Sequence, residues 1–432
     1  MTRTAGWPGL PPRPGSGAGG GGGGGHNITR RQRRRHALPV LVSLLSASTM
    51  VVGPMAAVGA ASGDPIRLPV MPSRLAAGAA CTGASDTVAK AMPWEQQNLQ
   101  LTRTREFGTG AGVTVAVVDT GVSLLAPTLA GRVTAVGEAG EDCVGHGTFV
   151  AGLIAAAPVK GVDFAGAARQ ARIVAVRGTD KRGTATDTTV AAGIRAAVDA
   201  GARVIAVSPA LTRDSATLRS AVSYAAGHDA LIVAAAAPDA SRDSTSSAPP
   251  PADYWPAAAT GVLSVVDVDV QGRRPQGAFT PRHADVAAPG DGVLGIGPRG
   301  RGHFIGSGPS LAAGYAAATA ALVRSAHPGL TAAGTARRLI TTAYPADVPQ
   351  LDPYGAVTSV PGASRDRAAR ADGSRPVRLE RDEAGARATH RALMVAGAGG
   401  GLVLVVAWAA VAAPKGRARR WRPAGNGASP PA

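Results

Sequence analysis

Three polar residues, far apart in the chain, are of types that combine in nucleophilic catalysis. Asp119 directly follows an apolar run, His146 lies between two glycines, and Ser310 opens a long alanine-rich stretch. A serine at the start of a helix can act as a nucleophile whose backbone N–H and helix dipole face a developing oxyanion. Each residue alone also has a simpler interpretation, as a turn residue, a polar loop residue or a helix N-cap. The order Asp, His, Ser along the chain favours a joint role.

The segments around these residues alternate between predicted strands and predicted helices. Short apolar and β-branched runs predict strands at residues 113–118, 172–176, 204–207, 230–234 and 261–266. Helical periodicity predicts helices at residues 149–157, 187–200, 215–227, 311–326 and 331–342. This alternation predicts an α/β domain from about Phe107 to Val357, with a parallel sheet and helices on both faces. Asp119 would then lie at the carboxyl edge of the sheet, where open α/β folds place their sites.

The basic charge of the chain is concentrated at its two ends. The 432 residues carry a net charge of +17, and 45% of them are hydrophobic, which excludes a wholly disordered chain. Residues 1–36 hold seven Arg and residues 414–432 hold four Arg and one Lys, with no acid in either segment. The ends therefore contribute +12 and leave +5 for the rest. A modestly charged middle without a groove-reading or stacking motif predicts no nucleic-acid partner.

The N-terminal end resembles a secretory signal. Five arginines between Arg30 and Arg35 precede an uncharged apolar run from Ala37 to about Ala61, which ends in small residues. The run is also long enough to be an uncleaved signal anchor. In either case, the segment that follows is expected to be exported across the membrane.

The C-terminal end contains one predicted membrane crossing. Ala392 to Ala413 has no charged residue, and five basic residues follow between Lys415 and Arg422. The positive-inside rule then keeps the C-terminal tail in the cytoplasm and the main domain outside it. A buried core helix is the alternative, but nothing downstream could pack around it.

These patterns divide the chain into six predicted segments. They are a basic region and signal peptide at 1–60, an N-terminal extension at 61–105, a catalytic domain at 106–358, a linker at 359–391, a transmembrane helix at 392–413 and a basic cytoplasmic tail at 414–432. Membrane lipid is thus an expected partner of the C-terminal helix.

The two cysteines, Cys81 and Cys143, are an even count in an exported chain, where a disulfide can persist. Their bridge would tie the N-terminal extension to the loop that carries His146. Two buried thiols are the alternative. Zinc is not expected because clustered Cys and His ligands are lacking, and no other cofactor is predicted.

Together, these motifs resemble the subtilisin-like serine peptidases. The resemblance covers about Pro93 to Val357 and implies a subtilisin-like parallel sheet that brings Asp119, His146 and Ser310 into one hydrogen-bonded relay. It implies that Ser310 attacks a peptide carbonyl, that His146 takes and returns the proton, and that Asp119 orients His146.

Further features resemble the mycosins, which are membrane-anchored subtilisin-like peptidases of type VII secretion systems. The resemblance rests on Pro93-Trp-Glu-Gln-Gln-Asn-Leu99 before the domain, on Asp142-Cys143 close to His146, on a cysteine in the extension, and on both predicted membrane segments. The resemblance implies a protein or peptide substrate and a type VII secretion membrane complex as partner. It also implies that Ser208, Pro209 and Ala210 line the substrate, although the family's Asn in the preceding strand is Ala206 here.

Two departures from the family pattern concern catalysis. The strand that supplies the family's oxyanion-hole Asn is matched by Ala234-Ala-Ala-Ala-Pro238, which puts Pro238 at the Asn position, and no Asn occurs between Asn98 and Asn426. Loss of such a donor lowers turnover by about 10²- to 10³-fold. In addition, Pro309 replaces the Thr before the nucleophile, which suits a helix start and leaves the Ser310 N–H in place. The sequence therefore predicts a serine endopeptidase with an impaired oxyanion hole, or alternatively a weak or inactive pseudo-peptidase with a structural role in the secretion machinery.

Overall fold

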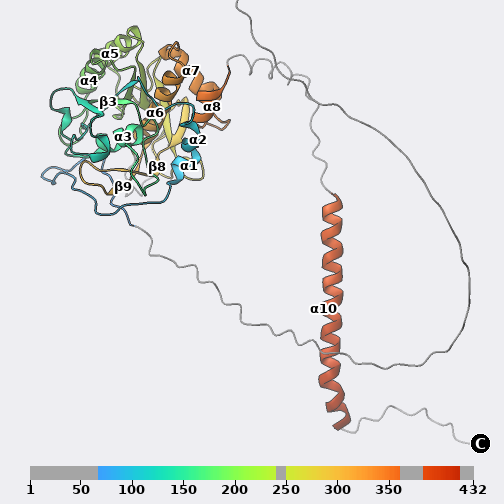
Figure 1. The fold of residues 1–432 in the computed structure, drawn as a ribbon. Helices are drawn as coiled ribbons and strands as arrows, with labels where there is room; N and C mark the ends of the chain where they lie inside the picture. Colours follow the sequence, from blue (N-terminus) through green and yellow to red (C-terminus); the bar gives the residue numbers. More distant parts are fainter. Residues whose placement is uncertain (1–66, 240–249, 361–382, 419–432) are drawn as a thin grey trace, which may run out of the picture. The chain divides into compact units, whose positions relative to one another are not determined.

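The computed structural model describes residues 67–239, 250–360 and 383–418 (Figure 1). The predicted signal sequence, most of the predicted linker and most of the predicted tail lie outside the described residues.

A parallel β-sheet forms the centre of the main domain. Within the described residues it has seven strands in the order β2-β3-β1-β4-β5-β6-β7, and each neighbouring pair is parallel. The strands are β1 (Thr114–Asp119), β2 (Val133–Ala135), β3 (Arg172–Arg177), β4 (Val204–Val207), β5 (Leu231–Ala235), β6 (Leu263–Val268) and β7 (Val286–Pro289). The predicted α/β class and parallel sheet are therefore confirmed.

Both faces of the sheet are buried, which explains why its strands are almost continuously apolar. In β1, Val115 and Val117 face one hydrophobic cluster, while Ala116 and Val118 face a second cluster on the other side. Successive side chains of a strand point to opposite faces, so a strand between two helical layers needs apolar residues at every position.

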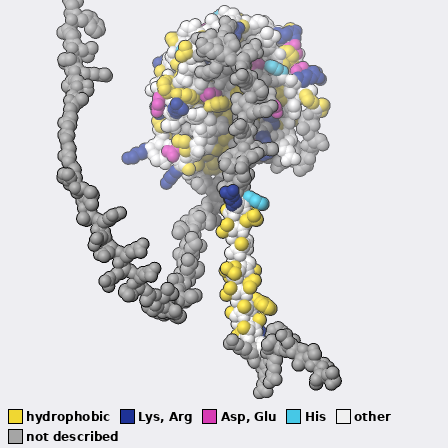
Figure 2. Space-filling model, turned by 90° about the vertical axis from the view of Figure 1, so that its right-hand side faces the viewer, with side chains coloured by type: hydrophobic (Ala, Val, Ile, Leu, Met, Phe, Trp, Pro, Cys, Tyr) yellow, Lys and Arg dark blue, Asp and Glu magenta, His cyan; other side chains and the backbone are white. Residues whose placement is uncertain are grey.

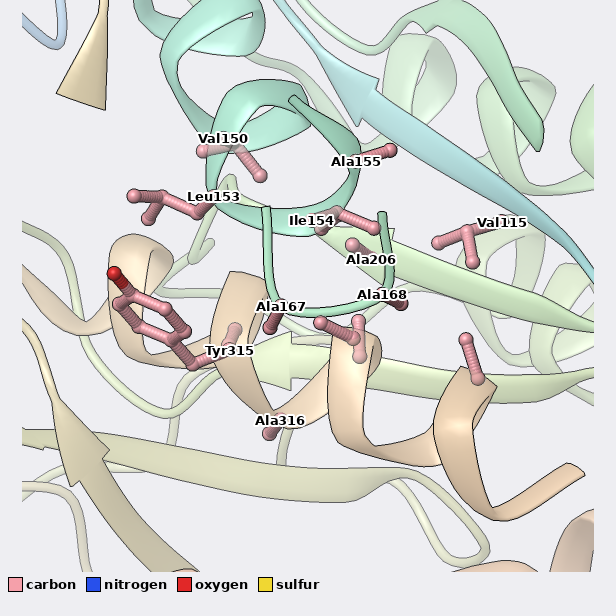
Figure 3. Packing of buried hydrophobic residues seen from close by; sticks show 14 of the residues in the cluster. Val115, Val150, Leu153, Ile154, Ala155, Ala167, Ala168, Ala206, Tyr315 and Ala316 are labelled. Carbon is pink, nitrogen blue, oxygen red and sulfur yellow. The ribbon is translucent and has the colours of Figure 1, made fainter. Parts of the chain in front are cut away.

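Two helical layers cover the sheet. α3 (His146–Ala155) and α6 (Pro309–Ala326) belong to the first cluster, and α4 (Asp187–Asp199) and α5 (Ala216–Gly227) to the second. Figure 3 shows Tyr315 of α6 beside Val150 and Leu153 of α3, among alanines such as Ala167 and Ala316. These small side chains allow helix and sheet to approach closely, and all of α6 from Pro309 to Arg324 is buried. The remaining helices of the domain are α1 (Trp94–Asn98), α2 (Leu101–Thr104), α7 (Ala332–Thr342) and α8 (Pro353–Thr358), with 3₁₀ turns η1 (Pro127–Leu129) and η2 (Gly137–Gly140).

A separate antiparallel hairpin follows the sheet. It consists of β8 (Asp291–Ile296) and β9 (His303–Ser307), with a register irregularity between Asp291 and Val293. Glycines interrupt both strands, which is why their apolar pattern did not predict them. Val70 of the N-terminal extension forms a parallel bridge to Ile305 of β9.

The N-terminal extension packs into the core of the catalytic domain. Leu99 and Leu101 are almost fully buried in the same cluster as α3 and α6. Cys81 and Cys143 form the predicted disulfide, across a sequence separation of 62 residues. By the chain-entropy argument, a loop of this length contributes about 4 kcal/mol to stability.

Glu95 of α1 is a fully buried carboxyl group. One of its oxygens, Oε1, accepts a hydrogen bond of 2.9 Å from the Leu294 N–H. Burial raises the pKa of Glu95 from 4.5 to about 7, because the buried site disfavours the charged carboxylate.

We expect this carboxyl group to make folding stability pH-dependent. Its folded-state pKa lies above the unfolded value, so its contribution is complete below pH 4.5 and is lost as pH rises through about 7. The shift from 4.5 to 7 corresponds to roughly 3 kcal/mol. Urea unfolding at pH 5 and pH 8 should show a smaller pH effect in Glu95→Gln than in wild type. Equal pH effects in the two proteins would contradict the prediction.

The C-terminal helix α10 (Glu383–Ala418) contains a candidate membrane span. His390–Gly416 is 27 residues long with a mean hydropathy of 2.1, and its most apolar window is fully exposed. Figure 2 shows hydrophobic side chains along this helix. By length and composition it could cross a bilayer, as predicted for residues 392–413.

Candidate active site

Asp119 is the last residue of β1, at the carboxyl edge of the sheet. The residue is 1% exposed, and its Oδ1 accepts a hydrogen bond of 2.6 Å from the Thr120 N–H. Because β1 lies between β3 and β4, the carboxylate is held within the sheet rather than in a mobile surface loop.

His146 is the first residue of α3 and faces Asp119. The preceding Gly145 has a φ of +93°, a left-handed conformation that favours glycine. The following residue, Gly147, lies against the chain after β1, because a Cβ there would be 2.1 Å from the Gly121 carbonyl oxygen. These glycines let the His146 loop approach the Asp119 loop closely.

Asp142 organises the loop that presents His146. Its carboxylate accepts hydrogen bonds from the backbone N–H groups of Gly145 (2.7 Å) and Thr148 (2.9 Å) and from the hydroxyls of Thr148 (2.7 Å) and Thr120 (2.8 Å). Burial raises the pKa of Asp142, although these donors oppose the shift. Asp142 is thus a positioning residue, which the sequence analysis used only as part of a family motif.

Ser310 completes a chain of hydrogen bonds that begins at Asp119. His146 Nδ1 lies 2.9 Å from Asp119 Oδ2, and His146 Nε2 lies 3.1 Å from Ser310 Oγ. All three residues are buried. The structure therefore brings the three predicted residues together from β1, α3 and α6.

The electrostatics of the pair Asp119 and His146 favour an ion pair. Burial alone would raise the pKa of Asp119, but the imidazole lowers it below its ordinary value. Burial alone would lower the pKa of His146, but Asp119 and then Asp239 hold it well above its ordinary value. The imidazolium form of His146 is thus stabilised in the resting site.

A second carboxylate, that of Asp239, lies against Ser310. Asp239 Oδ1 accepts a hydrogen bond of 3.1 Å from the Ser310 N–H, and Oδ2 accepts one of 2.8 Å from the Ser310 hydroxyl. Oδ2 is also 3.3 Å from His146 Nε2. The sequence analysis placed Pro238 at the oxyanion position; Pro238 lines the cleft, but the side chain that reaches Ser310 belongs to the next residue.

An open cleft of about 820 Å³ leads to these residues. It is lined by Asp119, His146 and Asp239, and by the predicted substrate-lining residues Ser208, Pro209 and Ala210. The residues from Val70 to Arg74 of the N-terminal extension form part of its wall. This wall is held by the hydrogen bonds Met71 N–H to Ile305 (2.8 Å) and Leu75 N–H to Arg182 (2.9 Å), and by the disulfide further along the extension.

Among the described residues, no group of three or more His, Cys, Asp or Glu side chains could hold a metal ion. The acidic residues of the site are instead engaged with hydrogen-bond donors of the protein itself.

Comparison with known proteins identifies the family of the chain. The profile described as the subtilase family matches residues 110–376, more than half of the chain. The chain belongs to the subtilase family. As a subtilase it is a serine endopeptidase, and its curated relatives include mycosins. Mycosin-4 of Mycobacterium tuberculosis is 32% identical over 373 residues, which cover 74% of this chain and 80% of the relative.

Solved structures agree with this assignment. A structure of the MycP3 protease from the type VII (ESX-3) secretion system matches with a TM-score of 0.56 and 30% identity, covering 65% of this subtilase and 93% of that chain. A structure of the periplasmic assembly from the ESX-5 inner membrane complex matches with a TM-score of 0.57 and 28% identity, covering 70% and 92%. The predicted subtilisin-like fold of the mycosin type is therefore confirmed.

Two features of the site escaped the sequence analysis. Asp239 was missed because the family strand was matched to Ala234–Pro238, which put Pro238 at the Asn position. An acidic residue directly after that position could have indicated that residue 239 reaches the nucleophile. The wall from Val70 to Arg74 carried no local signal, because only the folded extension brings it to the cleft.

Proposed function

We propose that this subtilase is a membrane-anchored, extracytoplasmic endopeptidase that works with a type VII secretion complex. The observation that carries the catalytic part is the hydrogen-bonded chain from Asp119 through His146 to Ser310, beside an open cleft that Asp119 and His146 line. We assign Ser310 as the nucleophile, His146 as the general base and acid, and Asp119 as the residue that orients His146.

Each acylation step follows from the positions of these atoms. Ser310 Oγ attacks the peptide carbonyl carbon, and its proton passes to Nε2 of neutral His146, 3.1 Å away. Asp119, at 2.9 Å from Nδ1, stabilises the resulting imidazolium. The C–N bond then breaks as His146 returns the proton to the leaving amine. Water repeats the sequence on the acyl-enzyme and releases the acid product.

The features of the cleft favour a peptide substrate over a small molecule. It is open to solvent and has a volume of about 820 Å³, and the backbone from Ser208 to Ala210 follows the carboxyl end of β4, next to β1. An extended peptide can pair with such a partly exposed backbone segment. The N-terminal extension, linked to the domain by its disulfide, would form another part of the wall.

The location at the membrane is supported by the C-terminal helix and by the relatives. α10 is long and apolar enough for one crossing, and basic residues from Lys415 onward favour a cytoplasmic tail. Together with the predicted signal sequence, this orientation puts the catalytic domain outside the cytoplasm. We further propose the six-segment organisation given above, with the boundaries at residues 60, 105, 358, 391 and 413.

A structural role in the secretion complex is the second candidate function. The carboxylate of Asp239 against Ser310 favours it, because this place would hold a hydrogen-bond donor in an efficient enzyme. Co-purification of an intact secretion complex with the Ser310→Ala protein, and its loss without the domain, would support this function.

Reaction with a fluorophosphonate probe tests the catalytic proposal. We expect the probe to label wild type at Ser310, because the relay makes this hydroxyl nucleophilic, and not to label Ser310→Ala. Ser325→Ala, near the other end of α6, serves as the matched control and should be labelled like wild type. Peptide mapping by mass spectrometry identifies the labelled residue. A folded wild-type protein labelled no more than Ser310→Ala, even after prolonged reaction, would overturn the assignment.

A further inference from the structure

Asp239 has no role in the relay, yet it is the acidic side chain in direct contact with the nucleophile. Both of its oxygens accept hydrogen bonds from Ser310, at 3.1 Å from the backbone N–H and at 2.8 Å from the hydroxyl. Its side chain is only 11% exposed. The contact is therefore shielded from solvent and well defined.

The start of α6 explains why a carboxylate is held there. The first backbone N–H groups of an α-helix have no acceptor four residues earlier within the helix, and the helix dipole favours a negative group beside them; α6 is such a helix of 18 residues. Gly308 leaves room for it, because a Cβ at Gly308 would be 2.0 Å from Asp239 Oδ1. Asp239 thus acts as a cap on α6, supplied by the chain after β5.

The same place is needed during the reaction. When Ser310 attacks a carbonyl, the negative oxygen of the intermediate must accept a hydrogen bond from the Ser310 N–H. The Asp239 carboxylate already takes that N–H and carries a negative charge of its own. It therefore competes with the oxyanion for a donor and repels it.

Two further contacts of Asp239 also oppose attack by Ser310. The Ser310 hydroxyl donates its single proton to Asp239 Oδ2 at 2.8 Å, so that this proton does not point at His146 Nε2, 3.1 Å from the same oxygen. In addition, His146 lies between two carboxylates, those of Asp119 and Asp239, which favour its imidazolium form. An imidazolium cannot accept the serine proton.

We propose that Asp239 is a built-in restraint on the peptidase: its carboxylate occupies the oxyanion position and holds Ser310 in a slow state. This inference rests on the proposed function, because it needs Ser310 to be the nucleophile. An amide of the same shape at residue 239 removes the charge and can donate a hydrogen bond to the oxyanion. The restraint is thus a property of one side chain and can be relieved by one substitution.

The rate of phosphonylation of Ser310 in the full-length chain in detergent tests this inference. We expect Asp239→Asn to react about 10²- to 10³-fold faster than wild type, because the lost charge is replaced by a donor. Asp239→Ala should lie between the two, because it removes the charge without adding a donor. Asp199→Asn, an exposed acid at the end of α4, makes the same charge change away from the cleft and should react like wild type.

A second measurement follows the charge of His146 directly. In NMR titrations, the imidazole of His146 should lose its proton at lower pH in Asp239→Asn than in wild type, because one of its two carboxylate neighbours is removed. Asp199→Asn should leave this titration unchanged.

The possible outcomes separate this inference from the proposed function. If wild type is labelled at Ser310 and Asp239→Asn is labelled no faster, the restraint is refuted while the catalytic assignment stands. A slower Asp239→Asn would mean that Asp239 is a base for Ser310, which also refutes the restraint. If both proteins are folded and neither is labelled, both proposals fail.

Discussion

Replacing His146 should lower the rate of Ser310 acylation by about 10⁴-fold or more, the largest effect that we expect from any residue other than the nucleophile. In its neutral form, His146 is the base within reach of the Ser310 hydroxyl, at 3.1 Å, and it must also deliver a proton to the leaving amine. Both proton transfers are lost with the imidazole. The measurement is the rate of phosphonylation and of peptide hydrolysis at neutral pH.

The choice of substitution matters because Asp119 is buried beside His146. His146→Ala leaves the Asp119 carboxylate without its partner, so this variant should also unfold more easily. His146→Gln keeps an N–H donor near Asp119 but has no base, and it should lose activity while remaining folded. His303→Gln is a matched control, because His303 is also buried but lies in β9, outside the cleft lining. Retained acylation in folded His146→Gln would exclude His146 as the base.

The parts of the fold that the sequence predicted best are those buried on both faces. The strand predicted at residues 204–207 is β4 (Val204–Val207), and that predicted at 113–118 is displaced by one residue in β1 (Thr114–Asp119). Such strands need apolar side chains at every position, which makes them visible as short uninterrupted runs. In contrast, β2 (Val133–Ala135) has three residues at the edge of the sheet, and its burial is partial. It has no comparable pattern.

Some residues of the site could be predicted from their own segment of sequence, whereas others could not, because their position depends on how distant segments fold together. Asp119, His146 and Ser310 each lie at the end of an element that the sequence predicts, so topology alone brings them to one edge of the sheet. Asp239 lies after β5, and its contact with Ser310 depends on how the chain turns beyond the strand. When the family strand is matched to this sequence one residue too early, Pro238 rather than Asp239 is placed at the position of the family's Asn. The wall from Val70 to Arg74 depends on the hydrogen bonds and disulfide of the whole extension.

This division explains why the sequence predicted a missing donor beside Ser310 and did not predict a competing acceptor. A proline in place of Asn removes a donor and leaves an empty place. The structure instead puts an acceptor there, the Asp239 carboxylate, which binds the one backbone donor that remains at Ser310. A competing acceptor of this kind can be neutralised by one substitution of the same shape, Asp239→Asn.

Asp119→Asn is the second substitution for which we expect a large loss, about 10⁴-fold in the rate of acylation at neutral pH. The Asp119 carboxylate accepts the Nδ1–H of His146, which leaves Nε2 as the nitrogen that faces Ser310 and takes its proton. An amide at residue 119 can instead donate to Nδ1, and His146 then carries its proton on Nε2, where it cannot act as a base. The amide also cannot stabilise the imidazolium that forms during attack.

The two consequences of Asp119→Asn can be measured independently. Because Asp119 is the main group that raises the pKa of His146, its neutralisation should shift the NMR titration of His146 to lower pH. A lower pKa alone would leave more neutral His146 at pH 7 and would speed acylation, so a large loss of rate together with this shift shows that the orientation of the imidazole matters more than its charge state. Asp199→Asn should change neither quantity. If Asp119→Asn shifted the titration of His146 but kept the wild-type rate, Asp119 would serve only to stabilise the fold, and the relay from Asp119 to Ser310 would not be the basis of the activity.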